Sequence, residues 1–198
     1  MKKEWKAKNA AIFVVAAFIV GAVFGYVTYG LTNTQYEAGE NILYDSGFEE
    51  GVEDKLMYWH QGILPADNLT MSWDSEIKYS GSRSVSIYNT HIYNETVHNN
   101  WYQHIKAIPK GYTIELTGWI KTVEAESVNI AVSCLDENYE SVAFGTTQGI
   151  YTINGTTDWQ MYKARAIYVP SETETISVML MLTGTGQVWF DDVQLVIK

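Results

Sequence analysis

The chain has 198 residues, a formal net charge of −10 and a single cysteine, Cys134. This length allows one ordinary domain with an additional segment, and one cysteine excludes an internal disulfide framework. Residues 1–31 contain four lysines and one glutamate, so the remainder of the chain carries a net charge of −13. Since an acidic surface repels phosphate backbones, we expect no nucleic-acid partner.

Residues 10–31 form an uncharged, mainly apolar stretch. As a helix, these 22 residues would span about 33 Å, which is enough to cross a bilayer. The lysines of residues 1–9 precede it, so the positive-inside rule predicts a short cytoplasmic segment, a single-pass transmembrane helix and an extracellular remainder. The alternative is a cleaved signal peptide, although the apolar core is long for one. Either way, the rest of the protein lies outside the cell membrane.

Gly21 and Gly25 lie four residues apart in this stretch. Small residues at this spacing let two membrane helices approach closely, so a homodimer through this face is one interpretation. The alternative is that glycine and alanine are simply common in membrane spans. Residues 32–38 follow as a short polar tether.

From residue 39 onward, runs rich in Val, Ile, Thr, Tyr and Trp alternate with Gly, Pro and Asn turn signals. The expected strands are 42–44, 70–73, 84–88, 101–107, 112–121, 127–135, 159–168, 175–182 and 187–197. No sustained helical period follows the apolar stretch. The pattern predicts an all-β fold, a two-sheet sandwich or jelly roll, formed by residues 39–198.

Each end of this region carries an acid inside an apolar, strand-like run. These acids are Glu49, near the start, and Asp191, near the end. Strict alternation along the last strand points Asp191 inward with Val193 and Leu195, and points Asp192 outward. A buried carboxylate must be compensated, either by a cation or by capping a turn or pairing with Arg or Lys.

A series of short motifs then follows one order along the region. The motifs are Asn41-Ile-Leu, Ser46-Gly-Phe-Glu-Glu-Gly51, Trp59, Tyr79-Ser-Gly-Ser-Arg-Ser84, Pro109-Lys-Gly-Tyr112, Leu116-Thr-Gly-Trp-Ile-Lys121, Asp158-Trp159, Val169-Pro170 and Phe190-Asp-Asp-Val-Gln-Leu195. This series resembles carbohydrate-binding modules of the CenC type, which have a galactose-binding-like β-jelly roll. The resemblance covers residues 39–198.

The resemblance implies a structural Ca²⁺ near the two chain ends. It places Glu49 and Asp191 at the ion, with backbone oxygens from near Gly47 and from the turn around Ser80. A hard cation with oxygen ligands would compensate the buried acids. The resemblance also implies, for many members, a polysaccharide chain bound along a concave sheet face on aromatic platforms, whereas other members have no known sugar.

Six tryptophans lie beyond the apolar stretch. Trp59, Trp159 and Trp189 fall at positions where the resemblance implies packing. The expected sugar-binding residues are the platforms Trp101, Trp119 and Tyr139 and the hydrogen-bonding residues Gln103 and Glu115. For each of these residues the alternative is an ordinary core or surface role.

No signature of catalysis is present: the four histidines lack metal-ligand spacing, and there is no Gly-x-Ser-x-Gly elbow or phosphate loop. We therefore expect no enzyme. Three N-x-S/T sequons, at Asn68, Asn94 and Asn154, are glycosylation sites if the organism uses them. The sequence predicts a membrane-anchored, extracellular, non-catalytic domain that binds glycan. The alternative is a structural or adhesive surface domain of the same fold that binds protein or assembles with itself.

Overall fold

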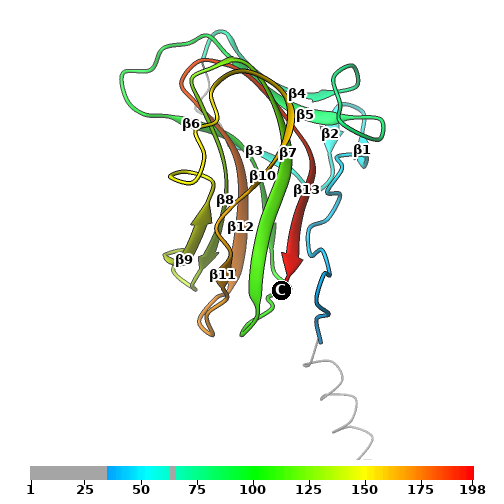
Figure 1. Ribbon diagram of the computed structural model, residues 1–198, viewed down its shortest axis with the longest axis vertical. Helices are drawn as coiled ribbons and strands as arrows, with labels where there is room; N and C mark the ends of the chain where they lie inside the picture. Colours follow the sequence, from blue (N-terminus) through cyan, green and yellow to red (C-terminus); the bar gives the residue numbers. More distant parts are fainter. Residues whose placement is uncertain (1–34, 63–65) are drawn as a thin grey trace, which may run out of the picture. The chain divides into compact units, whose positions relative to one another are not determined.

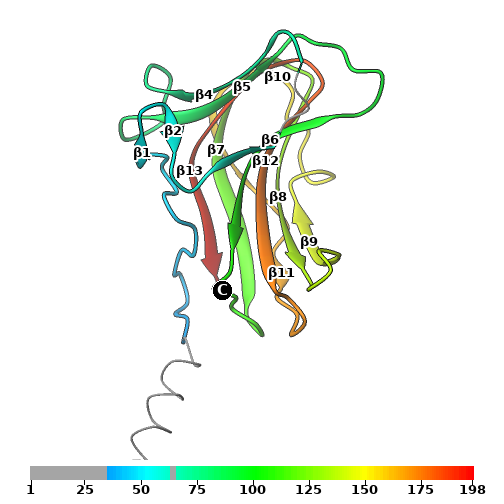
Figure 2. The ribbon, with the colours of Figure 1, turned by 180° about the vertical axis from the view of Figure 1, so that it is seen from behind.

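Two antiparallel sheets pack face to face in the computed structural model, which describes residues 35–62 and 66–198 (Figures 1 and 2). The six-stranded sheet has the order β10 (Gly155–Lys163), β7 (Thr113–Ala125), β13 (Gly186–Ile197), β5 (Ser84–Asn89) and β4 (Leu69–Asp74), with β11 (Ile167–Tyr168) also paired to β7. The five-stranded sheet has the order β3 (His60–Gly62), β6 (His98–Ile105), β12 (Thr175–Thr183), β8 (Ser127–Leu135) and β9 (Ser141–Thr146). A small hairpin joins β1 (Gly51–Val52) to β2 (Lys55–Leu56).

The prediction of an all-β sandwich is confirmed for the described residues. Eight of the nine expected strands are found: 127–135 has the expected bounds, 159–168 is divided into β10 and β11, and the others have shifted ends. The expected strand 42–44 is reduced to an isolated bridge between Asn41 and Val196. The short strands β1, β2, β3 and β9 were not predicted. In β9 the run Ser-Val-Ala-Phe-Gly-Thr contains Ala and Gly, which weaken the strand signal.

Residues 39–46 run beside β13, so the two ends of this region are neighbours, as both ribbon views show (Figures 1 and 2). The Gly39 amide donates to the Ile197 carbonyl at 2.8 Å, and the Ile42 amide donates to the Leu195 carbonyl at 2.9 Å. The Asn41 side chain adds a bond, because its Oδ1 accepts from the Leu195 amide at 3.0 Å. The segment thus pairs with the end of β13 that lies beyond β5, although it forms no regular strand.

The core lies between the inner faces of the two sheets. The six-stranded sheet contributes Val85, Ile87, Ile114, Leu116, Ile120, Val188 and Phe190, and the five-stranded sheet contributes Trp101, Ile130, Val132, Val178, Leu180 and Leu182. Each fully buried large side chain stabilises the fold by about 2 kcal/mol relative to exposure. Cys134 is buried with them as expected, and burial raises the pKa of its thiol.

A β-bulge corrects the predicted alternation of the last strand. Asp191 pairs with Trp119, but the next regular pair is Gln194 with Thr117, so Asp192 and Val193 lie opposite the single residue Gly118 and β13 has one extra residue. Asp192, with a φ of +44°, takes up the irregularity. Val193 consequently faces the core, whereas Asp191 lies on the outer surface of the sheet, and the expectation that they share a face is wrong.

Residues 37–198 form one compact unit. The expected cytoplasmic segment 1–9, transmembrane helix 10–31, glycine pair Gly21/Gly25 and the first part of the tether 32–38 lie outside the described residues. Within residues 35–62 and 66–198, no helix meets the length and hydropathy required of a membrane span.

Candidate functional site

Asp191 and Glu49, the two acids from opposite ends of the region, bind to the same loop, residues 79–83. Asp191 is fully buried, and its Oδ2 accepts from the amides of Tyr79 at 2.8 Å and Ser80 at 3.0 Å. Its Oδ1 accepts from the Asp192 amide at 2.8 Å. Glu49 Oε1 accepts from the amides of Ser82 and Arg83 at 2.7 and 3.2 Å. Compensation of Asp191 by a capped turn, the stated alternative to a cation, is therefore present.

The same loop holds the other acid of the last strand. Ser80 Oγ donates to Asp192 Oδ2 at 3.0 Å, so Asp192 points away from the core, as expected, and is half-buried beside the loop. Gly81 has a φ of +57°, and a Cβ there would overlap the Glu49 carboxylate. Glycine is thus required at this position for both backbone and space.

Asp45 is a fourth acid of this cluster, and the sequence reasoning missed it. Its Oδ1 accepts from the Glu49 amide at 2.6 Å, whereas its Oδ2 is buried and has no hydrogen-bond partner among the described residues. Burial raises the pKa of Asp45, and burial likewise raises the pKa of Asp191 against the lowering effect of the loop amides. Its place directly before the motif that begins with Ser46-Gly47 was the available signal.

The cluster fits a calcium ion only in part. The unpartnered Asp45 Oδ2 is a carboxylate oxygen of the kind that Ca²⁺ binds. Across the described ranges, however, no three Asp, Glu, His or Cys side chains converge closely enough to hold a metal. Both oxygens of Asp191 are already engaged by amides. A cation at this place would therefore depend on Asp45 and Glu49 and on backbone oxygens near Gly47.

On the opposite side of the sandwich, the outer surface of the five-stranded sheet carries a row of rings, and we call it the open face. Tyr102 of β6 is flanked by His60 of β3 and His104 of its own strand, at ring-centroid distances of 5.6 and 5.0 Å. Across the sheet, Phe144 of β9 is 52% exposed. Cross-strand pairs share a face of the sheet, so the pairs His104–Ser177, Ser177–Ser133 and Ser133–Phe144 join the two sides.

Beside Met179, which pairs with Tyr102, small side chains fill the middle of the open face. Ala131, Ser133 and Ser177 lie between the rings of β6 and Phe144, and all three are buried although they belong to an outer surface. Larger neighbours therefore cover them from the sides. The arrangement places aromatic rings at both margins of a flat, weakly polar strip.

The open face also lacks acids. The strands β3, β6, β12, β8 and β9 contain no Asp or Glu, although residues 32–198 carry a net charge of −13. Burial first, and then the positive charges of Lys106 and His60, lower the pKa of His104. Its imidazole is thus held toward the neutral form that can both donate and accept a hydrogen bond.

Two of the expected sugar-binding residues lie in the interior instead. Trp101 is 4% exposed, and its Nε1 donates to the Ser86 carbonyl of the facing sheet. Gln103 is also buried, and its amide bonds both backbone groups of Tyr44, at 2.9 and 2.8 Å. Trp101 is therefore not available as a platform, and Gln103 fastens the residue 39–46 segment to the five-stranded sheet.

Two others lie on the outer surface of the six-stranded sheet, far in the fold from the open face. Trp119 stacks on Tyr79, with ring centroids 3.8 Å apart, so one of its faces is occupied. Glu115 binds Lys198 at 2.7 Å and Lys163 at 3.2 Å, and the Lys198 ammonium lowers its pKa. These two residues stabilise their own sheet surface.

Of the five expected sugar-binding residues, Tyr139 is the one with a ring exposed enough to serve as a platform. It lies in the β8–β9 connection, is 63% exposed and has Lys106 Nζ 5.6 Å from its ring centroid. The sequence reasoning missed Tyr102, His60, His104 and Phe144. In β6 it chose Trp101 and Gln103 over Tyr102 and His104, although both pairs alternate equally well. The three sequon asparagines, Asn68, Asn94 and Asn154, are all exposed.

Comparisons with known proteins agree on the fold. No protein-family model matches the sequence, and a search of curated proteins gives no match either. The chain is similar to the xylan-binding CBM22-1 domain of Paenibacillus barcinonensis Xyn10C, with 15% identity and a TM-score of 0.54 over 82% of this chain and 97% of that one. It is similar to TmCBM61, solved with β-1,4-galactotriose, with 19% identity and a TM-score of 0.54 over 80% and 99% of the two chains.

A third similar structure belongs to an enzyme. It is the enzymatically active domain of bacteriophage CBA120 tailspike protein 4, with 16% identity and a TM-score of 0.59. The match covers 80% of this chain but only 21% of the tailspike chain. At these identities the similarities show a shared fold, and this chain therefore has the β-sandwich of carbohydrate-binding modules.

Proposed function

We propose that this protein binds a glycan, without cleaving it, on the open face of the five-stranded sheet. The observation that carries the proposal is the row of rings on a face without acids: Tyr102, His60 and His104 at one margin and Phe144 at the other. The C–H groups of a pyranose pack on aromatic rings, and imidazole and hydroxyl groups can bond its hydroxyls. The solved domains named above, two of them described with xylan or galactotriose, support this choice of ligand class.

The lack of acids on this sheet supports a non-catalytic role. Glycoside hydrolysis ordinarily requires two carboxyl groups flanking the bond that breaks. The strands that carry the open face supply none. The rings and small polar groups of these strands are suited to binding a glycan and not to hydrolysing it.

A glycan array with the full-length protein in detergent tests the proposal. We expect binding to at least one neutral polysaccharide, and we expect Tyr102→Ala to weaken it by roughly tenfold or more, equivalent to about 1.4 kcal/mol. Tyr168→Ala is the matched control, because Tyr168 is an exposed tyrosine of the six-stranded sheet. A folded protein that binds no glycan would contradict the proposal.

We further propose the CenC-type assignment and the membrane-anchored, extracellular location. Both rest on the sequence: the ordered motifs for the first, and the lysines before the apolar residues 10–31 for the second. Protease treatment of intact cells tests the location. Residues 37–198 should be digested from outside while the tip 1–9 stays protected. Protection of the whole chain would contradict it.

A structural Ca²⁺ at the acid cluster is a separate proposal. The buried, unpartnered Asp45 Oδ2 supports it, with Glu49 as a second ligand and Asp191 holding the loop. Chelation should lower the melting temperature of the unaltered protein, and Asp45→Ala should remove that dependence. An unchanged melt in chelator would contradict the metal assignment without affecting glycan binding.

The alternative, a surface domain that assembles with itself, predicts a different result. Light scattering of the full-length protein in detergent would then show a dimer or larger species, and monomers would count against it. The exposed Met161, beside Trp119 in the sheet register, favours such a contact on the six-stranded sheet.

A further inference from the structure

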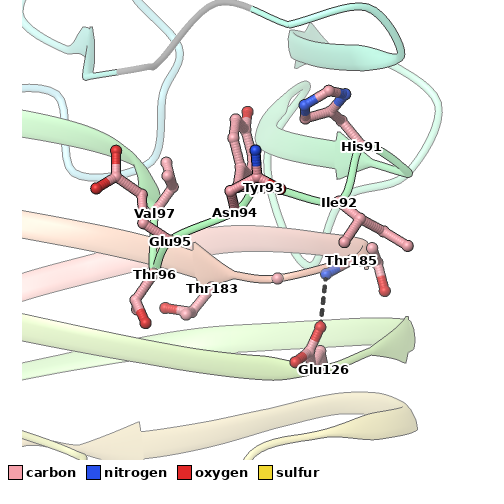
Figure 3. A pocket seen from close by; sticks show the side chains of 11 residues that line it. His91, Ile92, Tyr93, Asn94, Glu95, Thr96, Val97, Glu126, Thr183 and Thr185 are labelled. Atoms are coloured by element: carbon pink, nitrogen blue, oxygen red, sulfur yellow. Dashed lines mark hydrogen bonds between the residues drawn. The ribbon is translucent and has the colours of Figure 1, made fainter.

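A pocket of about 320 Å³ lies at one end of the sandwich, where the β5–β6 connection meets the β12–β13 turn (Figure 3). Its walls include His91, Tyr93, Asn94 and Glu95 from the connection, Thr183 from the end of β12, and Glu126 from the β7–β8 turn. None of these residues belongs to the acid cluster or to the ring row of the open face. The volume is at the small end of the range for small-molecule sites.

Internal bonds hold the walls of this end pocket in place. The fully buried Asn89 donates from Nδ2 to the carbonyls of His91 at 3.0 Å and Gly184 at 2.8 Å, which ties the connection to the turn. Glu126 and Thr185 exchange two bonds, at 3.1 and 2.8 Å, and the first is drawn in Figure 3. The pocket is therefore formed before any ligand enters.

The lining suits a neutral ligand rich in hydroxyl groups. It offers an imidazole, a phenol, an amide, two carboxylates and threonine hydroxyls, and it includes no Lys or Arg. Anionic ligands are therefore disfavoured. Behind the wall, the fully buried Asn99 contacts the Tyr93 hydroxyl at 3.4 Å, and its Oδ1 has no partner among the described residues. A hydroxyl or water at this end of the sandwich would satisfy it.

The end pocket adjoins the open face. His98 and Thr183 form the last cross-strand pair of β6 and β12, and His98 Nδ1 lies 2.7 Å from Thr183 Oγ1. Alternation along β12 puts Thr183 on the same surface as Met179, which pairs with Tyr102. Four residues of strand separate them, about 13 Å. A chain lying along the ring row in the strand direction would reach the pocket.

We propose that the end pocket is a second binding site, which takes the terminal residue of a neutral glycan whose chain lies on the open face. This inference rests on the proposed function and narrows it to recognition of chain ends. A pocket of this size holds one sugar ring and stops the chain, whereas an open sheet surface alone would accept internal segments anywhere along a polymer.

Calorimetric titration of the full-length protein in detergent tests this, with β-1,4-galactotriose, xylohexaose and trigalacturonate as probes. Thr96→Trp fills the pocket from an exposed position, and Glu172→Trp is the control at an exposed position of the β11–β12 turn. We expect Thr96→Trp to weaken binding of the neutral probes at least roughly tenfold. The control should bind normally, and trigalacturonate should bind much more weakly than galactotriose.

The outcomes separate this inference from the proposed function. If Thr96→Trp binds as well as the unaltered protein while Tyr102→Ala is weakened, the pocket is not a site and the open face stands. If neither substitution weakens binding, both are overturned. Equal or tighter binding of trigalacturonate overturns the neutral-ligand assignment, as does failure of both neutral probes to bind the unaltered protein. Melting curves of the two Trp variants should coincide, which shows that the loop substitution leaves the fold intact.

Discussion

The outer surfaces of the two sheets differ in what covers them. On the six-stranded sheet, the loop of residues 75–83 lies over Trp119 and Asp191, and Trp189 Nε1 donates to Asp74 at the end of β4. We call this surface the covered face. On the five-stranded sheet, no loop among residues 35–62 and 66–198 is seen to bind the row of Tyr102, His60 and His104 in a comparable way. Both surfaces carry rings at alternate strand positions. Acids that bind backbone amides lie on the covered face, whereas the strands of the open face contain no Asp or Glu.

The difference teaches that alternation alone does not decide which aromatic residues reach solvent. Trp119 and Tyr102 are equivalent in the strand pattern, and a loop from elsewhere in the chain takes one of them as a packing partner. The acids of the covered face fasten that loop. We therefore expect substitutions on the covered face to change stability and substitutions on the open face to change binding.

The largest expected effect comes from Asp191→Ala on the covered face. Three backbone amides lose their acceptor, which should cost about 3 kcal/mol or more of the free energy of unfolding. Thermal melting measures this, at roughly 3 °C for each kcal/mol. Asp158→Ala, which removes an exposed carboxylate paired with Lys121 on the same sheet, should change the melt little. Equal effects of the two would show that the loop is not held as described.

Gly81→Ala should give the next largest effect. The added Cβ meets the Glu49 carboxylate, and the left-handed backbone disfavours alanine, so we expect a loss of about 2 kcal/mol. Chemical denaturation followed by fluorescence measures it. Gly149→Ala is the control, since Gly149 also has a positive φ but open space around its Cβ position. The excess loss at Gly81 reports the contact with Glu49.

Tyr79→Ala should uncover Trp119 at a smaller cost. Loss of the stacked ring should destabilise the fold by about 1 kcal/mol and shift Trp119 toward solvent. Quenching of tryptophan fluorescence by acrylamide should increase, and Trp119→Phe in the same background should remove the increase. Glycan binding should remain unchanged. If Tyr79→Ala weakens glycan binding, the sugar site lies on the covered face and not on the open face.

The smallest effect is expected from His104→Gln on the open face. The pKa of His104 is lowered in the folded protein from the ordinary 6.5, so the unfolded chain binds a proton more readily. The histidine therefore destabilises the fold as the pH falls below about 6.5, and glutamine does not. The melting temperature of the variant minus that of the unaltered protein should increase slightly as the pH is lowered from 7.5 to 5. A constant difference would contradict this assignment.

The sequence predicted the fold better than the site. Long strands such as β7 and β12 have clear β-rich composition, so their positions and the sandwich were predictable. The burial of Asp191 was also predictable. Its compensation by the amides of Tyr79 and Ser80 was one of two stated alternatives, and sequence spacing does not choose between them because the partners lie more than one hundred residues away.

The platform residues were not predictable for a different reason. Trp101 and Tyr102 are neighbours on one strand, and nothing in that strand states which of them faces the second sheet. The answer depends on the partner strands, because Trp101 donates to Ser86 across the core. Recognition of Tyr102 also needed His60, from a strand too short to be predicted.

The bulge at Asp191 and Asp192 changes which side chains of β13 face the core. Before it, odd-numbered residues such as Trp189 face the covered side; after it, Val193 and Leu195 face the core. One strand thereby supplies an acid to a surface loop and two aliphatic side chains to the interior. Deleting Asp192 would restore strict alternation, and the residues that follow would exchange surfaces. The length of this strand is therefore as strictly constrained as its composition, and no substitution can take the place of the extra residue.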